Sequence, residues 1–363
     1  MTEAPASPEA EPSPVAAASP EPPHCVEATE VEQRIDAGRS VRLRKERWEV
    51  PGAVPLALVR KHLPGGPVLP PVLLVHGFAQ NRYSWHTSLR SFSAWLAERG
   101  FDVWNVELRG HGRSRALTDE APGAERFADY VDDVVRAAGA LPGPAFWVGH
   151  SLGGAAVYGA ATQAPPEVTP RGVIGIGALY QFAQANAFLK LLGTLTHFAG
   201  GASAGGRAAG RVQVRSRIAG QLLGRLYGIS DIAGFAFPIS GWWPGSMEPE
   251  LLRERLEHGF DWTSVRVWQE MSRWAATGAF EYDAAWNQTD LPVLVVLGDE
   301  DHLMPPRDGR VAFDRSGSSD KTLQVFGDWE HETHWGHIDL ILGRLAPRYT
   351  WPFLADWMEL RSR

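Results

Sequence analysis

The sequence predicts an α/β protein with a mostly parallel central sheet flanked by helices. Short apolar runs bounded by turn residues alternate with segments whose apolar residues recur at helical spacing. One run, at 145–148, continues into Gly149-His-Ser-Leu-Gly153 and then into small apolar residues at 155–163. A strand, a G-x-S-x-G turn and a helix in this order are typical of a tight turn that exposes a serine at the edge of a sheet.

The remaining elements follow from the same signals. Pro51-Gly52 separates the first two expected strands, and the uninterrupted apolar run at 70–75 indicates a central strand covered on both faces. Gly100 is a plausible end for the helix before it. The expected strands are 41–50, 54–61, 70–75, 102–106, 145–148, 172–176, 291–297 and 321–326, and the expected helices are 84–99, 127–140, 155–163, 182–195 and 262–276.

One interval breaks the alternation. Between Gly177 and Leu291 more than 100 residues pass without a strand of this type. A structureless loop of that length is improbable in a compact domain, and insertions at the carboxyl ends of parallel strands lie over the site. We therefore expect a helical cap inserted before the acid-bearing strand. The predicted division is an N-terminal tail at 1–35, the first part of the core at 36–180, the cap at 181–288 and the second part of the core at 289–363.

The N-terminal composition differs from that of the rest of the chain. The first 33 residues hold seven prolines and seven glutamates, with no lysine, arginine or aromatic residue. Such a segment buries too little apolar surface to order itself, so 1–35 is predicted to be a disordered acidic tail. The net charge is −7, and the remainder without those glutamates has 35 acidic and 35 basic residues. That balance gives no electrostatic reason to expect nucleic acid or an anionic membrane as a partner.

Targeting signals and cysteine usage favour a cytoplasmic protein. The chain shows no secretory signal, and no apolar run approaches the length of a membrane span, so no stable membrane insertion is expected. The single cysteine, Cys25, cannot form an internal disulfide. No cofactor is expected.

A nucleophilic serine needs a general base, which an acid must orient. In this strand order the acid should follow the nucleophile and precede the histidine. Asp301, after the strand at 291–297, is the best acid candidate, although alone it could be a solvated turn carboxylate like its neighbours Asp299 and Glu300. His337 is the favoured base because Gly336 precedes it and an apolar helical segment follows, and His334 is the second choice.

The oxyanion of an acyl-transfer reaction needs two N–H donors. The first is expected from the backbone of Leu152, which follows the nucleophile. The second is expected from the amide of Phe78, because Gly77 allows a close approach of the loop after the strand at 70–75. His76, His111 and His150 are each expected to be structural residues of their turns.

A metal site is a weaker interpretation of the histidine-rich segment. His331, His334 and His337 lie close together, but H-E-T-H lacks the H-E-x-x-H spacing and no cysteine is near. We therefore predict no metal ligands.

These motifs together resemble the α/β-hydrolase superfamily, in particular its lipase and esterase branch with a helical lid. The resemblance implies Ser151 as nucleophile, Asp301 as acid, His337 as base, and Phe78 and Leu152 as oxyanion donors. Haloalkane dehalogenases and most epoxide hydrolases of this fold have an aspartate where Ser151 stands. The stretches that carry the resemblance are HGFAQNRYSW at 76–85, GFDVWNVELRGHGRS at 100–114, GHSLGG at 149–154 and GHIDLILG at 336–343.

The expected reaction is hydrolysis of carboxylic esters through an acyl-enzyme, with a small-molecule ester of apolar acyl or aromatic character as substrate. An acyltransferase or thioesterase with the same triad is one alternative, and a non-catalytic binding protein that kept the fold is another. The only arginine cluster suited to a coenzyme A phosphate more plausibly forms a solvated helix face. The aromatic residues expected to line the substrate site are Phe182, Trp242 and Trp243, with Phe188, Phe235 and Phe237 as further candidates, and the arginine cluster is Arg207, Arg211, Arg215 and Arg217.

Overall fold

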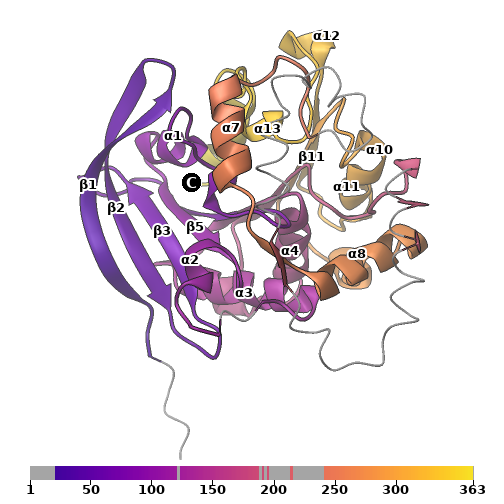
Figure 1. Cartoon of the computed structure of the whole chain (residues 1–363), viewed down its shortest axis with the longest axis horizontal. Helices are drawn as coiled ribbons and strands as arrows, with labels where there is room; N and C mark the ends of the chain where they lie inside the picture. The colour runs from indigo at the N-terminus through magenta and orange to yellow at the C-terminus, as the bar shows by residue number, and fades with distance from the viewer. Residues whose placement is uncertain are drawn as a thin grey trace, which may run out of the picture.

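A computed structural model gives the structure of residues 21–120, 123–187, 190–191, 194–195, 213–215 and 241–362. Its centre is a nine-stranded sheet in the order β1-β2-β3-β5-β4-β6-β7-β10-β11 (Figure 1). The six strands from β5 to β11 in that order run parallel, whereas β1, β2 and β3 pair antiparallel at one edge. The strands are β1 (His24–Asp36), β2 (Arg39–Val50), β3 (Leu56–His62), β4 (Pro71–Val75), β5 (Asp102–Glu107), β6 (Phe146–His150), β7 (Gly172–Ile176), β10 (Val293–Gly298) and β11 (Lys321–Phe326).

Helices cover both faces of the sheet. Buried residues of α1, α7, α13 and α14 form the core on one face, and those of α3, α4 and α8 form the core on the other. Within β4, Leu73 and Val75 belong to one core and Val72 and Leu74 to the other, which explains the continuous apolar run of this strand. The helices are η1 (Arg82–Ser84), α1 (Phe92–Glu98), α2 (Gly112–Arg115), α3 (Phe127–Gly139), α4 (Leu152–Ala161), η2 (Pro166–Val168), α7 (Pro249–His258), α8 (Val265–Thr277), α9 (Asp283–Trp286), α10 (Pro306–Gly309), α11 (Val311–Arg315), α12 (Asp328–His331), α13 (Asp339–Leu342) and α14 (Thr350–Leu360).

The N-terminal strand corrects one prediction. The expected disordered tail at 1–35 is wrong for residues 24–35, which form most of β1, while residues 1–20 lie outside the described part. The glutamates of β1 face the arginine-rich β2, and Arg42 Nε donates to Glu30 Oε2 at 2.8 Å. Ile35 is fully buried in the core beneath α1. The composition of the tail alone does not reveal the arginine partners of these glutamates, because the arginines lie on the following strand, β2.

The predicted helix at 84–99 is shorter than expected. Residues 82–84 form η1, and α1 begins only at Phe92, because the Ser91 side chain caps it by accepting from the Ala94 amide at 3.1 Å. The helix expected at 182–195 lies partly outside the described residues.

The described part of the inserted segment 181–288 contains more than helices. It includes α7, α8 and α9, and it also includes a two-stranded antiparallel sheet of β8 (Gln213–Arg215) and β9 (Trp262–Ser264). The helix expected at 262–276 therefore begins at Val265, after β9, with Ser264 as its N-cap. None of the described helices has both the length and the apolar character needed to cross a bilayer.

Candidate active site

Ser151 lies in a strained turn between β6 and α4. Its φ is +57° and its ψ is −127°, a conformation that non-glycine residues rarely adopt. A Cβ at Gly149 would lie 2.4 Å from the carbonyl oxygen of Gly153, and one at Gly153 would lie 2.3 Å from that of His76. Both flanking glycines are therefore required by close backbone packing, as the G-x-S-x-G pattern predicts.

Asp301 and His337 form a buried pair. His337 Nδ1 and Asp301 Oδ2 are 2.7 Å apart, and both side chains are almost completely excluded from solvent. The other carboxylate oxygen of Asp301 accepts from the amides of Leu303 at 2.9 Å and Met304 at 2.8 Å. Asp301 is thus fixed by its own loop, and it holds Nδ1 of His337, while the buried Nε2 of the same ring has no hydrogen-bond partner among the described residues.

The turn at Ser151 packs against the loop that bears His337. The rings of His150 and His337 are 4.4 Å apart, and His150 Nε2 lies 3.1 Å from the His337 carbonyl oxygen, which accepts its proton. Gly177 closes the other side, since a Cβ there would lie 2.9 Å from His337 Nδ1. The structure therefore brings Ser151 to the edge of the sheet that holds Asp301 and His337. In the described part of the chain, no hydrogen bond joins Ser151 to His337.

The loop after β4 reaches the same turn. A Cβ at Gly77 would lie 2.9 Å from Ser151 Cβ, so this glycine permits the contact. His76 Nε2 accepts from the Leu108 amide at 3.1 Å, and Nδ1 therefore donates to the Gly77 carbonyl at 2.9 Å. Burial lowers the pKa of His76 well below its ordinary value, so it braces the loop as a neutral ring. The Phe78 amide follows directly, and Leu152 begins α4, where helix N–H groups have no helical acceptor.

Cap residues hold this loop in place, a feature that the sequence did not indicate. The Asp261 amide donates to the Ala79 carbonyl at 2.8 Å, and Gln80 forms an isolated β-bridge with Phe260. Asn81 Nδ2 donates to the His258 carbonyl at 2.9 Å. These contacts join residues far apart in the sequence and have no local pattern.

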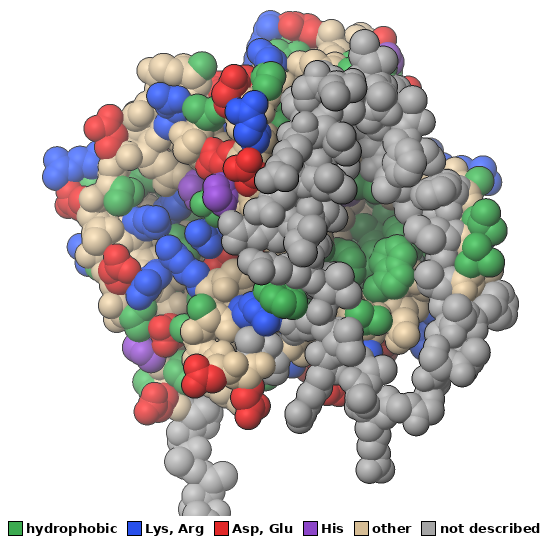
Figure 2. Space-filling model, viewed as in Figure 1, with side chains coloured by type: hydrophobic (Ala, Val, Ile, Leu, Met, Phe, Trp, Pro, Cys, Tyr) green, Lys and Arg blue, Asp and Glu red, His purple; other side chains and the backbone are tan. Residues whose placement is uncertain are grey.

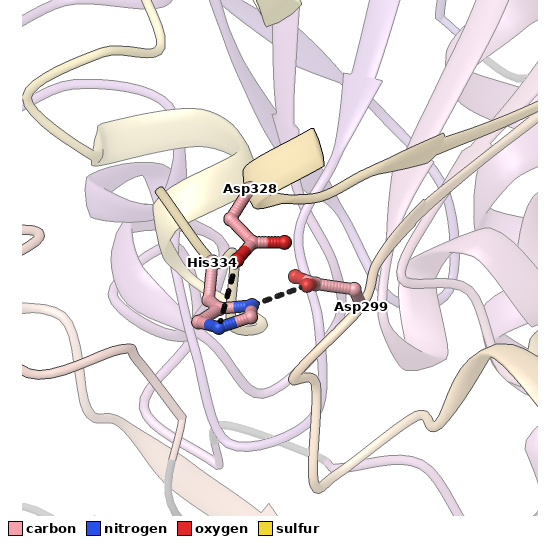
Figure 3. A group of neighbouring side chains, drawn as sticks. All are labelled: Asp299, Asp328 and His334. Carbon is pink, nitrogen blue, oxygen red and sulfur yellow. Dashed lines mark hydrogen bonds and ion pairs between the residues drawn. The ribbon is translucent and has the colours of Figure 1, made fainter. Parts of the chain in front are cut away.

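His334, the second choice for the base, lies between two other carboxylates (Figure 3). Its Nδ1 is 2.5 Å from Asp299 Oδ2 and its Nε2 is 3.4 Å from Asp328 Oδ2. The hydrogen bond to Asp299 raises the pKa of His334, which favours an imidazolium bridging the two aspartates. The three side chains offer ligand atoms within 4.8 Å of one another, but each ring nitrogen already faces a carboxylate.

The predicted aromatic lining divides into two groups. Trp242 and Trp243 lie along the His337 loop, because the Ile338 amide donates to Gly241 at 2.7 Å and the Trp243 ring is 4.5 Å from that of His334. Phe182 is instead buried in the core with α3, α4 and α8. Outside the described residues lie Phe188, Phe235, Phe237, Arg207, Arg211 and Arg217.

The buried carboxyl group of Asp339 lies beside the loop that bears His337. Asp339 Oδ2 accepts from the amides of Gly336 and Trp243, both at 2.8 Å. Burial raises the pKa of Asp339 to about 7, and the nearby charge of Asp301 adds to that rise.

A doubly covered parallel sheet, with a serine in the strained turn after its central strand and a buried aspartate–histidine pair at the same edge, defines the α/β-hydrolase class. The model of the alpha/beta hydrolase family matches residues 72–344. The chain belongs to this family, and the fold and class predicted from sequence are confirmed.

Sequence relatives match the chain over part of their length. Protein phosphatase methylesterase 1 of Mus musculus is 39% identical over 106 residues, which cover 28% of this chain and 26% of the relative. The pimeloyl-[acyl-carrier protein] methyl ester esterase of Methylococcus capsulatus is 37% identical over 99 residues, or 27% of this chain and 34% of the relative. The chain thus spans about a quarter to a third of the length of these curated relatives.

Solved structures show the same fold at low sequence identity. A monoacylglycerol lipase of Paleococcus ferrophilus superimposes with a TM-score of 0.59 at 18% identity, covering 85% of this chain and 99% of the lipase. A monoglyceride lipase of Saccharomyces cerevisiae gives a TM-score of 0.58 at 19% identity, with 86% and 94% covered.

Proposed function

We propose that the protein is a serine hydrolase that cleaves carboxylic esters of apolar acyl or aromatic substrates through an acyl-enzyme. The observation that carries the proposal is the buried Asp301–His337 pair beside the strained Ser151 turn. Asp301 occupies Nδ1 of the ring and so favours the tautomer whose Nε2 accepts a proton. That nitrogen has no hydrogen-bond partner in the part of the chain that the structure describes, which supports its proposed role as a general base.

In the proposed mechanism, His337 takes the proton of Ser151 as the serine oxygen attacks the ester carbonyl. The amides of Phe78 and Leu152 then stabilise the oxyanion, each contributing about 3 to 4 kcal/mol. Protonated His337 gives its proton to the leaving alcohol as the carbon–oxygen bond breaks. Water, deprotonated by the same histidine, releases the acid and restores Ser151.

The apolar substrate preference rests on the surface beside this pair. Trp242 and Trp243 are partly exposed along the His337 loop and offer flat apolar surface for an acyl or aromatic group. The two sequence relatives described above carry the names of esterases, which supports ester chemistry at this site. Phe182 is more consistent with core packing than with substrate contact. We also propose a cytoplasmic location, because Cys25 is an exposed free thiol.

The test is hydrolysis of p-nitrophenyl esters of short to long acyl chains by the wild type, Ser151→Ala and Ser318→Ala. Ser318 lies before β11, away from the turn, and serves as the matched substitution. We expect activity in the wild type and in Ser318→Ala, and none in Ser151→Ala. A wild type that is inert on the whole series and is not labelled at Ser151 by a fluorophosphonate contradicts the proposal. If the fluorophosphonate labels Ser151 but the p-nitrophenyl esters turn over only when an acyl acceptor is added, the result favours an acyltransferase. If Ser151 is labelled and only an acyl thioester is hydrolysed, it favours a thioesterase.

A further inference from the structure

Basic side chains gather on the face of β2 and β3 that α1 covers. Figure 2 shows Lys and Arg side chains concentrated over these strands, left of centre. Lys45 and Lys61 are direct cross-strand partners, and Arg47 lies on the same face because side chains alternate along a strand. Like charges placed directly opposite each other destabilise a sheet, so this arrangement opposes folding.

Lys61 is the most anomalous member of the group. Its side chain is only 3% exposed, and its ammonium donates to Ser93 Oγ at 2.9 Å. No carboxylate in the described part of the chain forms an ion pair with Lys61 or Lys45. Burial, Lys45 and the guanidinium of Arg82 lower the pKa of Lys61 well below its ordinary value. A buried cation without a counter-ion is costly, so burial here favours the neutral amine, and an anion beside Lys61 would favour the charged form.

Two arginines extend the group toward the loop after β4. Arg82 and Arg113 both contact the buried Glu107: Arg82 Nη1 lies 3.1 Å from Oε1, and the Arg113 amide donates to Oε2 at 2.9 Å. Within the described ranges the Arg113 guanidinium is incompletely satisfied, because its Nη1 is buried and has no hydrogen-bond partner there. Burial and the charge of Arg82 lower the pKa of Arg113.

The carboxylates on this face do not balance the cations. Glu107 is shared by the two arginines, and Glu27 pairs with Arg47 at 3.3 Å. Five basic side chains therefore face three acidic ones, Glu27, Glu49 and Glu107. Among the described residues, the basic groups without a carboxylate partner include Lys45, Lys61 and Nη1 of Arg113.

A cavity of about 260 Å³ adjoins this group, and Arg82 lines it. The opposite wall belongs to the cap and includes His258 and Trp262. Asp261 is the carboxylate of this cavity, and its oxygens already accept from the amides of Gly112 at 2.6 Å and Trp262 at 2.8 Å. The guanidinium of Arg115 lies over the Trp262 ring at 4.1 Å. The cavity lining thus includes one guanidinium, Arg82, and one carboxylate, Asp261, and Arg82 connects the cavity to the basic group on β2 and β3.

We propose that Lys45, Arg82 and Arg113, backed by the buried Lys61, form a binding site for the phosphate group of a small molecule at the edge of the cavity that Arg82 lines. A compact, multiply charged group satisfies several buried donors at once, whereas an extended polyanion needs a broad exposed surface. The site uses none of the residues assigned to ester hydrolysis, so a failure of one proposal does not contradict the other.

The test is calorimetric titration of the full-length protein with sodium pyrophosphate and with inorganic phosphate, at ionic strength fixed with sodium chloride. The variants are Lys45→Gln and Arg113→Gln, and the matched control is Arg310→Gln, which removes one charge from an exposed ion pair on α11. We expect saturable binding to the wild type and to the control, weakened at least about tenfold in both site variants. Arg113→Lys, which keeps the charge, should retain more affinity than Arg113→Gln.

A second readout separates binding from damage to the fold. Without ligand, Lys45→Gln should melt at or above the wild-type temperature, because it removes the repulsion with Lys61. With pyrophosphate, the wild type and the control should gain thermal stability and Lys45→Gln should gain little. Absence of saturable binding to the wild type overturns the proposal, as does equal binding by Lys45→Gln and Arg310→Gln.

Discussion

The pairs Asp301–His337 and Asp299–His334 join the same two loops, one after β10 and one before α13, yet they have opposite environments. The first pair is buried, and one nitrogen of its histidine has no hydrogen-bond partner among the residues that the structure describes. The second is partly exposed, and its histidine has both nitrogens beside carboxylates. Residue type and spacing therefore do not distinguish a base from a salt bridge. Burial and the number of acidic neighbours do, since they decide whether one ring nitrogen remains to accept a proton or both lie beside carboxylates.

The largest expected difference between the pairs is in catalysis. His337→Ala should lower kcat for a p-nitrophenyl ester by at least about 10⁴-fold, because no other group takes the serine proton. His334→Ala should change kcat by less than about 10-fold, since its nitrogens bind aspartates. Steady-state kinetics of both variants test this. Equal losses would contradict the assignment of His337 as the base.

The acids should differ in the same direction. Asp301→Asn should reduce kcat by about 10³- to 10⁴-fold, because an amide can hold the ring in the wrong tautomer. Asp299→Asn, the matched change two residues earlier, should retain most of the activity. The comparison is made at saturating ester, with circular dichroism to confirm folding. An Asp301→Asn enzyme as active as Asp299→Asn would remove Asp301 from the mechanism.

Asp339 extends the comparison to a buried carboxyl group without a histidine partner. Its pKa is raised to about 7, so the folded state binds a proton that the unfolded chain has lost above about pH 4. Wild-type stability should therefore fall as pH rises from about 4 to 7, by about 2 to 4 kcal/mol from this group. Asp339→Asn should flatten that fall, measured by urea unfolding across this range. If the unfolding free energy of Asp339→Asn depends on pH as that of the wild type does, the raised pKa of Asp339 is contradicted.

The smallest expected effect belongs to His334, whose side chain is partly exposed. Asp299 raises its folded-state pKa, so the pair stabilises the fold fully below the ordinary pKa of histidine. That stabilisation is lost as pH rises through the raised value. His334→Gln should remove a contribution of less than about 1 kcal/mol, visible at pH 5 and absent at pH 9. Melting temperatures of wild type and variant at the two pH values provide the measurement.

The parts of the fold that sequence could predict are those with local signals. Buried parallel strands appear as apolar runs, and the turn at Ser151 is specified by Gly149 and Gly153. The position of β1 was not predictable from its own composition, because its glutamates find their arginines on β2. The start of α1 depended on the Ser91 cap, which an apolar pattern at 84–99 obscured.

For the candidate site, order along the chain was more informative than chemistry. Strand order directed attention to the loop after β10, but it did not separate Asp301 from Asp299 and Glu300, which follow the same strand. The substrate-binding role predicted for Phe182 rested on weaker grounds than the choice of Asp301. In the sequence, an aromatic residue near a site looks the same whether its side chain lines a cavity or packs in a core. Burial separates the two cases, and burial is a property of the folded chain.

The contacts of the segment from His258 to Asp261 have a consequence for protein engineering. This segment belongs to the cap by sequence, but it holds the backbone at Ala79 and the side chain of Asn81 in the core. A chimera that exchanges the cap for that of another hydrolase would lose these anchors, even if both core halves were kept intact. The transplantable module is therefore not the cap alone, but the cap together with the matching loop at residues 79–81.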